Sequence, residues 1–144
     1  MRNVKFMGLR TDMEGWVEGD LIHTRSGQAC IGCFDTMGFK AVPVKEETLR
    51  ESTGIPDKHG MDIFSGAIVR KQEYPFYDGG KYRYFGVVEW CEDKAAYMVR
   101  LARATSWASS KLLGLKFELK GRVFEVIGNR WDNRSLLIND NERG

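Results

Sequence analysis

The sequence predicts a mainly β protein that folds as one compact unit. The chain contains 16 glycines but only three prolines, and the glycines separate short apolar segments, as turn residues do. Several of these segments alternate apolar with polar residues, which is the period of a strand. Long apolar stripes with the helical period of about 3.6 residues are scarce, so little helix is expected.

The N-terminal part is expected to form four strands followed by a short helix. The strands are predicted at residues 3–9, 14–22, 27–34 and 39–44. In the second of them, EGWVEGDLI, Trp16 alternates with charged neighbours, as in a strand with one face in solvent. Residues 45–52, KEETLRES, are mostly helix-forming and have acids at the start, which predicts one or two helical turns.

A turn and a curved strand are predicted next, in the stretch TGIPDKHGMDIFSGAIVR. Pro56 fixes its own φ for a turn, Asp57 can accept hydrogen bonds from the backbone that follows it, and Gly60 can adopt a left-handed conformation. Residues 61–71 then have the pattern of one mostly buried strand. Gly66 inside this strand predicts a bulge or a sharp bend of the kind that small barrels need.

The C-terminal part is expected to continue as strands and to end in a short helix. Strands are predicted at residues 81–90, 95–102 and 117–127, and a loop with one helical turn at residues 103–115. The pattern AAYMVRLA alternates aromatic or branched residues with others, which favours a strand over a helix. The tail at 133–139 is predicted as a terminal helix with Asn133 or Ser135 as its cap.

Composition and the N-terminal sequence predict a soluble, cytoplasmic protein. Apolar residues make up 42% and charged residues 29% of the chain, which is ordinary for a globular domain. No apolar run approaches the roughly 18 residues that cross a membrane, and MRNVKFMGLRTDMEG lacks the apolar core of a signal peptide. Three cysteines, an odd number, fit a reducing compartment. We therefore expect no membrane partner.

Three stretches of the sequence resemble a known family. They are VKFMGLRTDMEGWVEGDLI, VKEETLRESTGIPDKHGMDIFSGAIVR and FEVIGNRWDNRSLL. The central stretch is similar to a TG-x-x-D-K-x-G turn followed by a strand, and the last to an EVIGN signature. In this order they resemble the YopX-like proteins of phages and prophages, and they span nearly the whole chain.

The chain departs from that family pattern at two positions. Gly66 is followed by Ala67, where the family usually has an aspartate, and Arg134 stands where a proline is common. The resemblance implies an SH3-like small barrel at about 53–131, after an N-terminal β segment at about 1–52 and before a tail or helix at 132–144. It also implies an accessory protein of a phage or prophage, located in the bacterial host cytoplasm, and it implies no activity.

No constellation in the sequence indicates catalysis, a metal or a cofactor. Cys30 and Cys33 form a C-x2-C pair, which fits half of a zinc site, a redox dithiol or two structural thiols. No helix is predicted after the pair, as a redox site needs, and the other candidate ligands, Cys91, His23 and His59, are scattered. Structural thiols are therefore the favoured interpretation. Because the sequence also lacks the motifs of phosphate, dinucleotide and zinc-protease sites, we expect a non-catalytic protein.

An aromatic hairpin at residues 74–85 indicates binding. It contains six aromatic rings among basic residues, a pattern found in packed hairpins, in oligomer interfaces and in stacking platforms for single-stranded nucleic acid. We favour packing and self-association, and expect a homo-oligomer with Tyr77, Tyr82 and Tyr84 in its interface. A host or phage protein is a further expected partner.

A basic segment at residues 94–122 supports the alternative, a nucleic-acid-binding module. It has seven basic residues against one acid, a net charge of +6, while the whole chain has +2. Cations that folding gathers on one surface can bind phosphates. The candidate contacts are Arg100, Arg103, Lys111, Lys116, Lys120 and Arg122. A solvated basic face is the simpler interpretation of the same residues.

Overall fold

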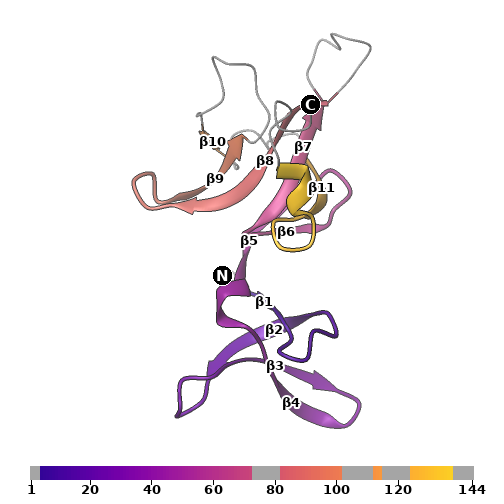
Figure 1. The fold of residues 1–144 in the computed structure, drawn as a ribbon, viewed down its shortest axis with the longest axis vertical. Coiled ribbons are helices and arrows are strands. Elements are labelled where there is room, and N and C mark those ends of the chain that lie inside the picture. Colours follow the sequence, from indigo (N-terminus) through magenta and orange to yellow (C-terminus); the bar gives the residue numbers. More distant parts are fainter. Residues whose placement is uncertain (1–3, 73–81, 102–111, 115–123, 138–144) are drawn as a thin grey trace. The chain divides into compact units, whose positions relative to one another are not determined.

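The structure is a computed structural model that describes residues 4–72, 82–101, 112–114 and 124–137. It is mainly β, as the sequence predicts, with two antiparallel sheets (Figure 1). Packing divides the chain into two compact units, Met1–Gly54 and Ile55–Gly144, which we call unit 1 and unit 2. The single domain expected over residues 1–144 stays a prediction.

Unit 1 is a meander of antiparallel strands. They are β1 (Phe6–Leu9), β2 (Trp16–His23), β3 (Ala29–Asp35), β4 (Gly38–Pro43) and β5 (Arg50–Pro56), the last of which continues into unit 2. β1 pairs with β2 and with β5, β2 pairs with β3, and β3 pairs with β4. The four strands predicted in the N-terminal part are confirmed, with their ends shifted by a few residues.

One face of the unit 1 sheet encloses a small core. Its buried residues are Ala29, Ile31 and Val44, against which Phe6, Val17, Leu21 and Leu49 pack. Ala29 and Ile31 are two residues apart on β3 and therefore face the same side. The ends of β1 and β4 approach each other, and the N–H of Thr11 donates to the carbonyl of Pro43 at 3.1 Å. The result is a single bridge between Arg10 and Val44.

The helix predicted at residues 45–52 is shorter than expected. It is a 3-10 turn, η1 (Glu46–Thr48). Arg50 and Glu51 already belong to β5, where they pair with Met7 and Phe6 of β1. Strand pairing thus overrides the helical propensity of this segment.

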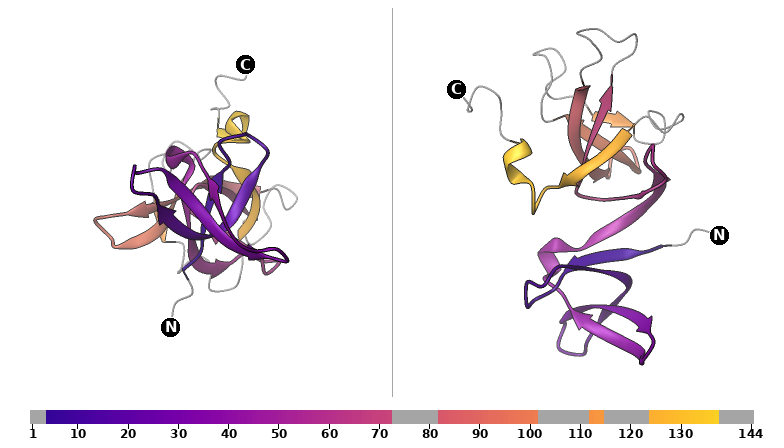
Figure 2. Two further views of the ribbon diagram at one scale, coloured as in Figure 1. Left: turned by 90° about the horizontal axis from the view of Figure 1, so that it is seen from below. Right: turned by 90° about the vertical axis from the view of Figure 1, so that its right-hand side faces the viewer.

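Unit 2 is organised around a five-stranded sheet with the order β10-β9-β8-β7-β11. The strands of this sheet are β7 (Ala67–Gln72), β8 (Tyr82–Cys91), β9 (Ala96–Leu101), β10 (Leu112–Gly114) and β11 (Phe124–Asn129). Unit 2 also contains β6 (Asp62–Phe64), which belongs to the other sheet. The core is formed by Ile63, Ala67, Val69, Val88, Tyr97, Val99 and Phe124. A short 3-10 helix, η4 (Arg134–Leu137), follows β11 and is yellow in Figure 2.

The SH3-like barrel is not confirmed. In the five-stranded sheet β10 and β11 are the two outer strands, and in the other sheet, ordered β4-β3-β2-β1-β5-β6, the outer strands are β4 and β6. Across the described strands, neither sheet closes on itself. The architecture is therefore stated as two open antiparallel sheets.

Residues 61–71 form two strands rather than the single strand that the sequence predicts. β6 ends at Phe64, Gly66 has φ +81°, and β7 begins at Ala67. The N–H of Gly66 donates to the carbonyl of Val88 at 2.7 Å, and the carbonyl of Gly66 accepts from the N–H of Arg130 at 3.0 Å. The sharp bend expected at Gly66 is confirmed, but it is a turn between strands.

Among its described residues, the C-terminal part differs from the prediction at two places. The strand predicted at 117–127 is present from Phe124 onward as β11, and residues 117–123 lie outside the described ranges. β8 and β9 confirm the strands predicted at 81–90 and 95–102. Leu112–Gly114 form a strand paired with β9, where the sequence predicts a loop with a helical turn. The short terminal helix is present as η4, but the side chain of Asn133 accepts a hydrogen bond from the N–H of Asn129 at 3.0 Å. It therefore stabilises the turn before η4.

Replacing Gly60 with valine should lower the melting temperature by several degrees. Gly60 has φ +83°, and no atom lies within 4 Å of the position that a Cβ would take. The substitution therefore adds backbone strain of about 1–2 kcal/mol without a steric clash. Thermal melts followed by circular dichroism test this, with Gly60→Asn as the milder control, since asparagine tolerates the left-handed region. An unchanged melting temperature for the valine variant contradicts the prediction.

Candidate functional site

The predicted interface of tyrosines falls largely outside the described part of the chain. Tyr77 lies outside it, and Tyr82 and Tyr84 lie in β8, where the backbone alone is described. The oligomer interface at these residues stays a prediction.

Among the candidate nucleic-acid contacts, Arg100 is the residue that the structure describes. Arg103, Lys111, Lys116, Lys120 and Arg122 lie outside the described ranges. The guanidinium of Arg100 donates two hydrogen bonds to Oε2 of Glu89 on β8, at 3.0 and 2.7 Å. Glu89 also lies 4.0 Å from the guanidinium of Arg130, so it offsets part of the charge of Arg100 and makes Arg100 a weaker phosphate ligand than the sequence suggests.

The C-x2-C pair lies within the regular part of β3. Residues three apart on a strand point to opposite faces of a sheet, and accordingly Cys30 is 4% exposed while Cys33 is half-buried. The two sulfur atoms of this pair therefore do not converge on one zinc ion or one disulfide. Across the described residues, no three histidine, cysteine or acidic side chains form a group that could hold a metal.

The central and C-terminal signature stretches meet at the edge of β11. This strand is an outer strand of its sheet, with β7 on one side. On the other side, the N–H of Lys58 donates to the carbonyl of Phe124 at 2.8 Å, and the N–H of Val126 donates to Oδ2 of Asp57 at 3.2 Å. The turn thus occupies the place of a further strand and covers the edge, which protects it from pairing with other chains.

Asp57 holds this turn together. Its side chain is 1% exposed. Oδ1 accepts hydrogen bonds from the N–H groups of His59 and Met61, both at 2.8 Å, while Oδ2 accepts the one from Val126. One carboxylate therefore satisfies three backbone amides, two within the turn and one on β11. The sequence indicates the turn, but it contains no signal for a contact between residues 69 positions apart.

Glu125 is the centre of a cluster of charges beside this turn. Arg70, its cross-strand neighbour on β7, donates two hydrogen bonds to Oε1 at 3.1 and 2.6 Å. Lys58 Nζ and His59 Nε2 lie 3.1 and 3.4 Å from Oε2. Hydrogen bonds from Lys58, then from Arg70, and a smaller one from His59 lower the pKa of Glu125 from its ordinary 4.5 to about 2. The signature turn is thus attached to β11 by charge as well as by backbone hydrogen bonds.

Acid should destabilise the protein through Glu125. Because the folded-state pKa of Glu125 is about 2 and its ordinary value is 4.5, its contribution is fully present above pH 4.5 and is lost as the pH falls through 2. Urea unfolding between pH 7 and pH 2 should show a smaller loss below pH 4.5 for Glu125→Gln than for the native chain. The control is Glu47→Gln, at an exposed position of η1. Parallel pH profiles for all three proteins contradict this role.

The C-terminal signature forms a second structural corner, after β11. Oδ1 of Asn129 accepts hydrogen bonds from the N–H groups of Trp131 and Asp132, at 3.0 and 2.8 Å. The ring of Trp131 covers Gly66, where an added Cβ would lie 2.5 Å from it. Residues of the signatures therefore hold the bend at Gly66 and the turn after β11 in place.

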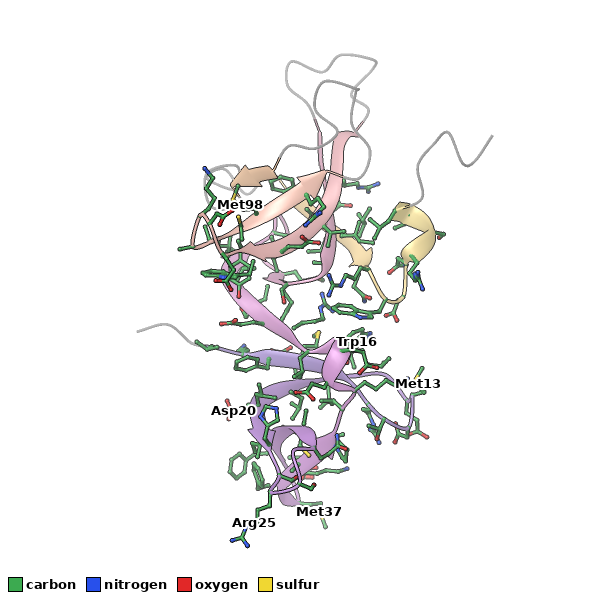
Figure 3. All side chains as sticks on the ribbon, turned by 60° about the vertical axis from the view of Figure 1, so that its left-hand side comes forward. Met13, Trp16, Asp20, Arg25, Met37 and Met98 are labelled. Carbon is green, nitrogen blue, oxygen red and sulfur yellow. The ribbon has the colours of Figure 1, made fainter. Side chains whose placement is uncertain are left out.

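Unit 1 exposes an apolar surface that the sequence reasoning missed. At the end of the β3–β4 hairpin, Phe34 is 81%, Met37 is 92% and Phe39 is 54% exposed. We call these three residues the hairpin tip; Met37 is labelled in Figure 3 and extends away from the ribbon. The rings of Phe34 and Phe39 meet edge to face, with centroids 5.3 Å apart. The alternation of β3 indicates two faces but does not reveal which one stays in solvent.

The described residues contain no helix with the length and apolar character that a membrane span requires.

Comparisons with known proteins find a family and a fold. The YopX protein family model matches residues 11–138. Among solved structures, the chain is similar to the crystal structure of protein EF1440 from Enterococcus faecalis, with a TM-score of 0.58 and 16% sequence identity over 96% of this chain and 100% of that one. At this identity the likeness shows the fold alone. No curated protein matches the sequence.

Proposed function

We propose that this chain, which belongs to the YopX protein family, is a non-catalytic phage or prophage accessory protein that acts by binding other protein chains. The observation that supports this function best is the hairpin tip. Phe34 and Phe39 meet in solvent there, and Met37 is exposed in the turn between their strands. Large exposed apolar side chains gathered in this way mark a site of protein interaction.

The charges of unit 2 also favour a protein partner over nucleic acid. Glu89 is shared by Arg100 and Arg130, and Glu125 by Arg70 and Lys58, so each carboxylate offsets part of the charge of two cations. Cations that already have carboxylate partners release fewer counterions from a phosphate backbone, so they contribute less to nucleic-acid affinity. The alternative rests on the basic residues of segment 103–122, which lie outside the described part.

Light scattering at micromolar concentration tests self-assembly. We expect a mass above the 16.5 kDa of one chain, because the aromatic hairpin provides the homo-oligomeric interface at Tyr77, Tyr82 and Tyr84. The double variant Phe34→Ser, Phe39→Ser should keep that mass. The triple variant Tyr77→Ser, Tyr82→Ser, Tyr84→Ser should have a lower mass. A clean monomer in the native chain contradicts self-assembly.

Titration of labelled single-stranded DNA at low and high salt tests the nucleic-acid alternative. We expect no binding at low salt. A monomer that binds DNA with a steep loss of affinity in salt contradicts the proposed function and replaces it with nucleic-acid binding.

A further inference from the structure

β4 has an edge that is open to solvent. It is an outer strand of its sheet, paired with β3 on one side. The N–H of Val44 donates to the carbonyl of Ala29 at 3.0 Å. Because backbone groups alternate in direction along an antiparallel strand, the N–H and C=O groups of Phe39 and Ala41 point away from β3. The carbonyl of Pro43 fits this alternation, since it accepts from Thr11 on the outer side.

Within the described part of the chain, no strand pairs with this edge over a short stretch. Gly38, Phe39, Lys40 and Ala41 are all exposed. Pro43, which has no N–H, ends the stretch on one side, and the hairpin turn ends it on the other. An exposed edge of this kind accepts an added strand from another chain, and main-chain hydrogen bonds then provide affinity. The edge of β11, by contrast, is covered by the turn that Asp57 holds.

The two faces of the edge differ in chemistry. On one face Phe39 packs against Phe34 and covers Gly32. A Cβ added at Gly32 would lie 2.8 Å from the Phe39 ring. On the other face Lys40 is exposed, and its cross-strand neighbour is Cys33 on β3. An added strand would therefore place apolar side chains beside Phe39 and one side chain of the opposite face beside Lys40.

Charge decides what kind of strand fits. If a second copy paired with this edge symmetrically through Phe39 and Ala41, Lys40 of one copy would lie directly opposite Lys40 of the other. Like charges in that position are destabilising, and opposite charges are stabilising. The edge therefore disfavours a second copy and favours an acidic residue.

We propose that β4 binds an extended segment of a different protein, with an acidic residue opposite Lys40 and apolar residues on either side of it. The segment adds an antiparallel strand to the unit 1 sheet through the backbone of Phe39 and Ala41, while its apolar side chains cover the hairpin tip. This inference rests on the proposed protein-binding function and specifies the partner surface.

Nuclear magnetic resonance of isotope-labelled full-length protein tests the inference. The probe is the capped peptide Ser-Thr-Phe-Glu-Phe-Thr-Ser, and the matched control peptide has lysine in place of glutamate. We expect the amide signals of Phe39 and Ala41 to shift and to become protected from hydrogen exchange with the first peptide. Because the central pair changes from opposite to like charge, the control should bind about fivefold more weakly.

Two variants with the same change in net charge sharpen the test. Lys40→Glu should reverse the preference between the peptides, whereas Lys94→Glu, at an exposed position of unit 2, should leave it unchanged. Equal affinities, or unmoved Phe39 and Ala41 amides, overturn the proposal. The same amides shifting when the protein alone is concentrated also overturn it, in favour of a second copy. These outcomes concern β4 alone. They are distinct from a failure of the proposed function, which would be a monomer that binds single-stranded DNA with a steep loss of affinity in salt.

Discussion

Replacing Asp57 with alanine is expected to lower the free energy of unfolding by about 3 kcal/mol, because it leaves three backbone donors without their acceptor. Those donors belong to His59, Met61 and Val126. The carboxylate that accepts from them is almost fully buried, so water does not readily replace it. Urea unfolding at pH 7 measures the loss.

Two control variants make the Asp57 result specific. Asp20→Ala changes the same residue type at an exposed position of β2 and should alter the free energy by less than about 0.5 kcal/mol. Asp57→Asn keeps the shape and one acceptor oxygen, so it should lose less stability than alanine. If alanine at position 57 costs no more than alanine at position 20, the turn is not held by this carboxylate.

Local features of the fold could be predicted from the sequence, because they depend on neighbouring residues. The strands of unit 1 follow from period-two alternation, and the left-handed Gly60 and the bend at Gly66 follow from turn chemistry. The helical composition of residues 45–52 was misleading beyond Thr48, since pairing with β1 is worth more to Arg50 than helix propensity.

Contacts between distant segments could not be predicted in this way. Nothing near Asp57 in the sequence indicates that its second oxygen accepts from Val126, and nothing near Arg100 indicates that it donates to Glu89. The same holds for the edge of β4. A strand pattern shows alternation, but whether Phe39 and Lys40 lie at an open edge depends on which strands pair.

Replacing Gly66 with alanine is expected to lower the free energy of unfolding by about 3 kcal/mol. Two effects add. The residue has φ +81°, and a left-handed alanine costs about 1–2 kcal/mol. Its Cβ would also lie 2.5 Å from the ring of Trp131, and such overpacking typically costs a further 1–3 kcal/mol or so.

Gly60→Ala separates the two effects, because Gly60 has nearly the same φ, +83°, but open space around the new Cβ. Chemical unfolding of both variants should show a loss of about 1 kcal/mol at Gly60 and roughly three times that at Gly66. Trp131→Leu provides the last comparison. In that background the smaller side chain leaves room for the methyl group, so Gly66→Ala should cost only the backbone strain, and the two substitutions should be non-additive. If alanine costs the same at both glycines, Trp131 yields without penalty, and the corner formed by the C-terminal signature does not fix the bend between β6 and β7.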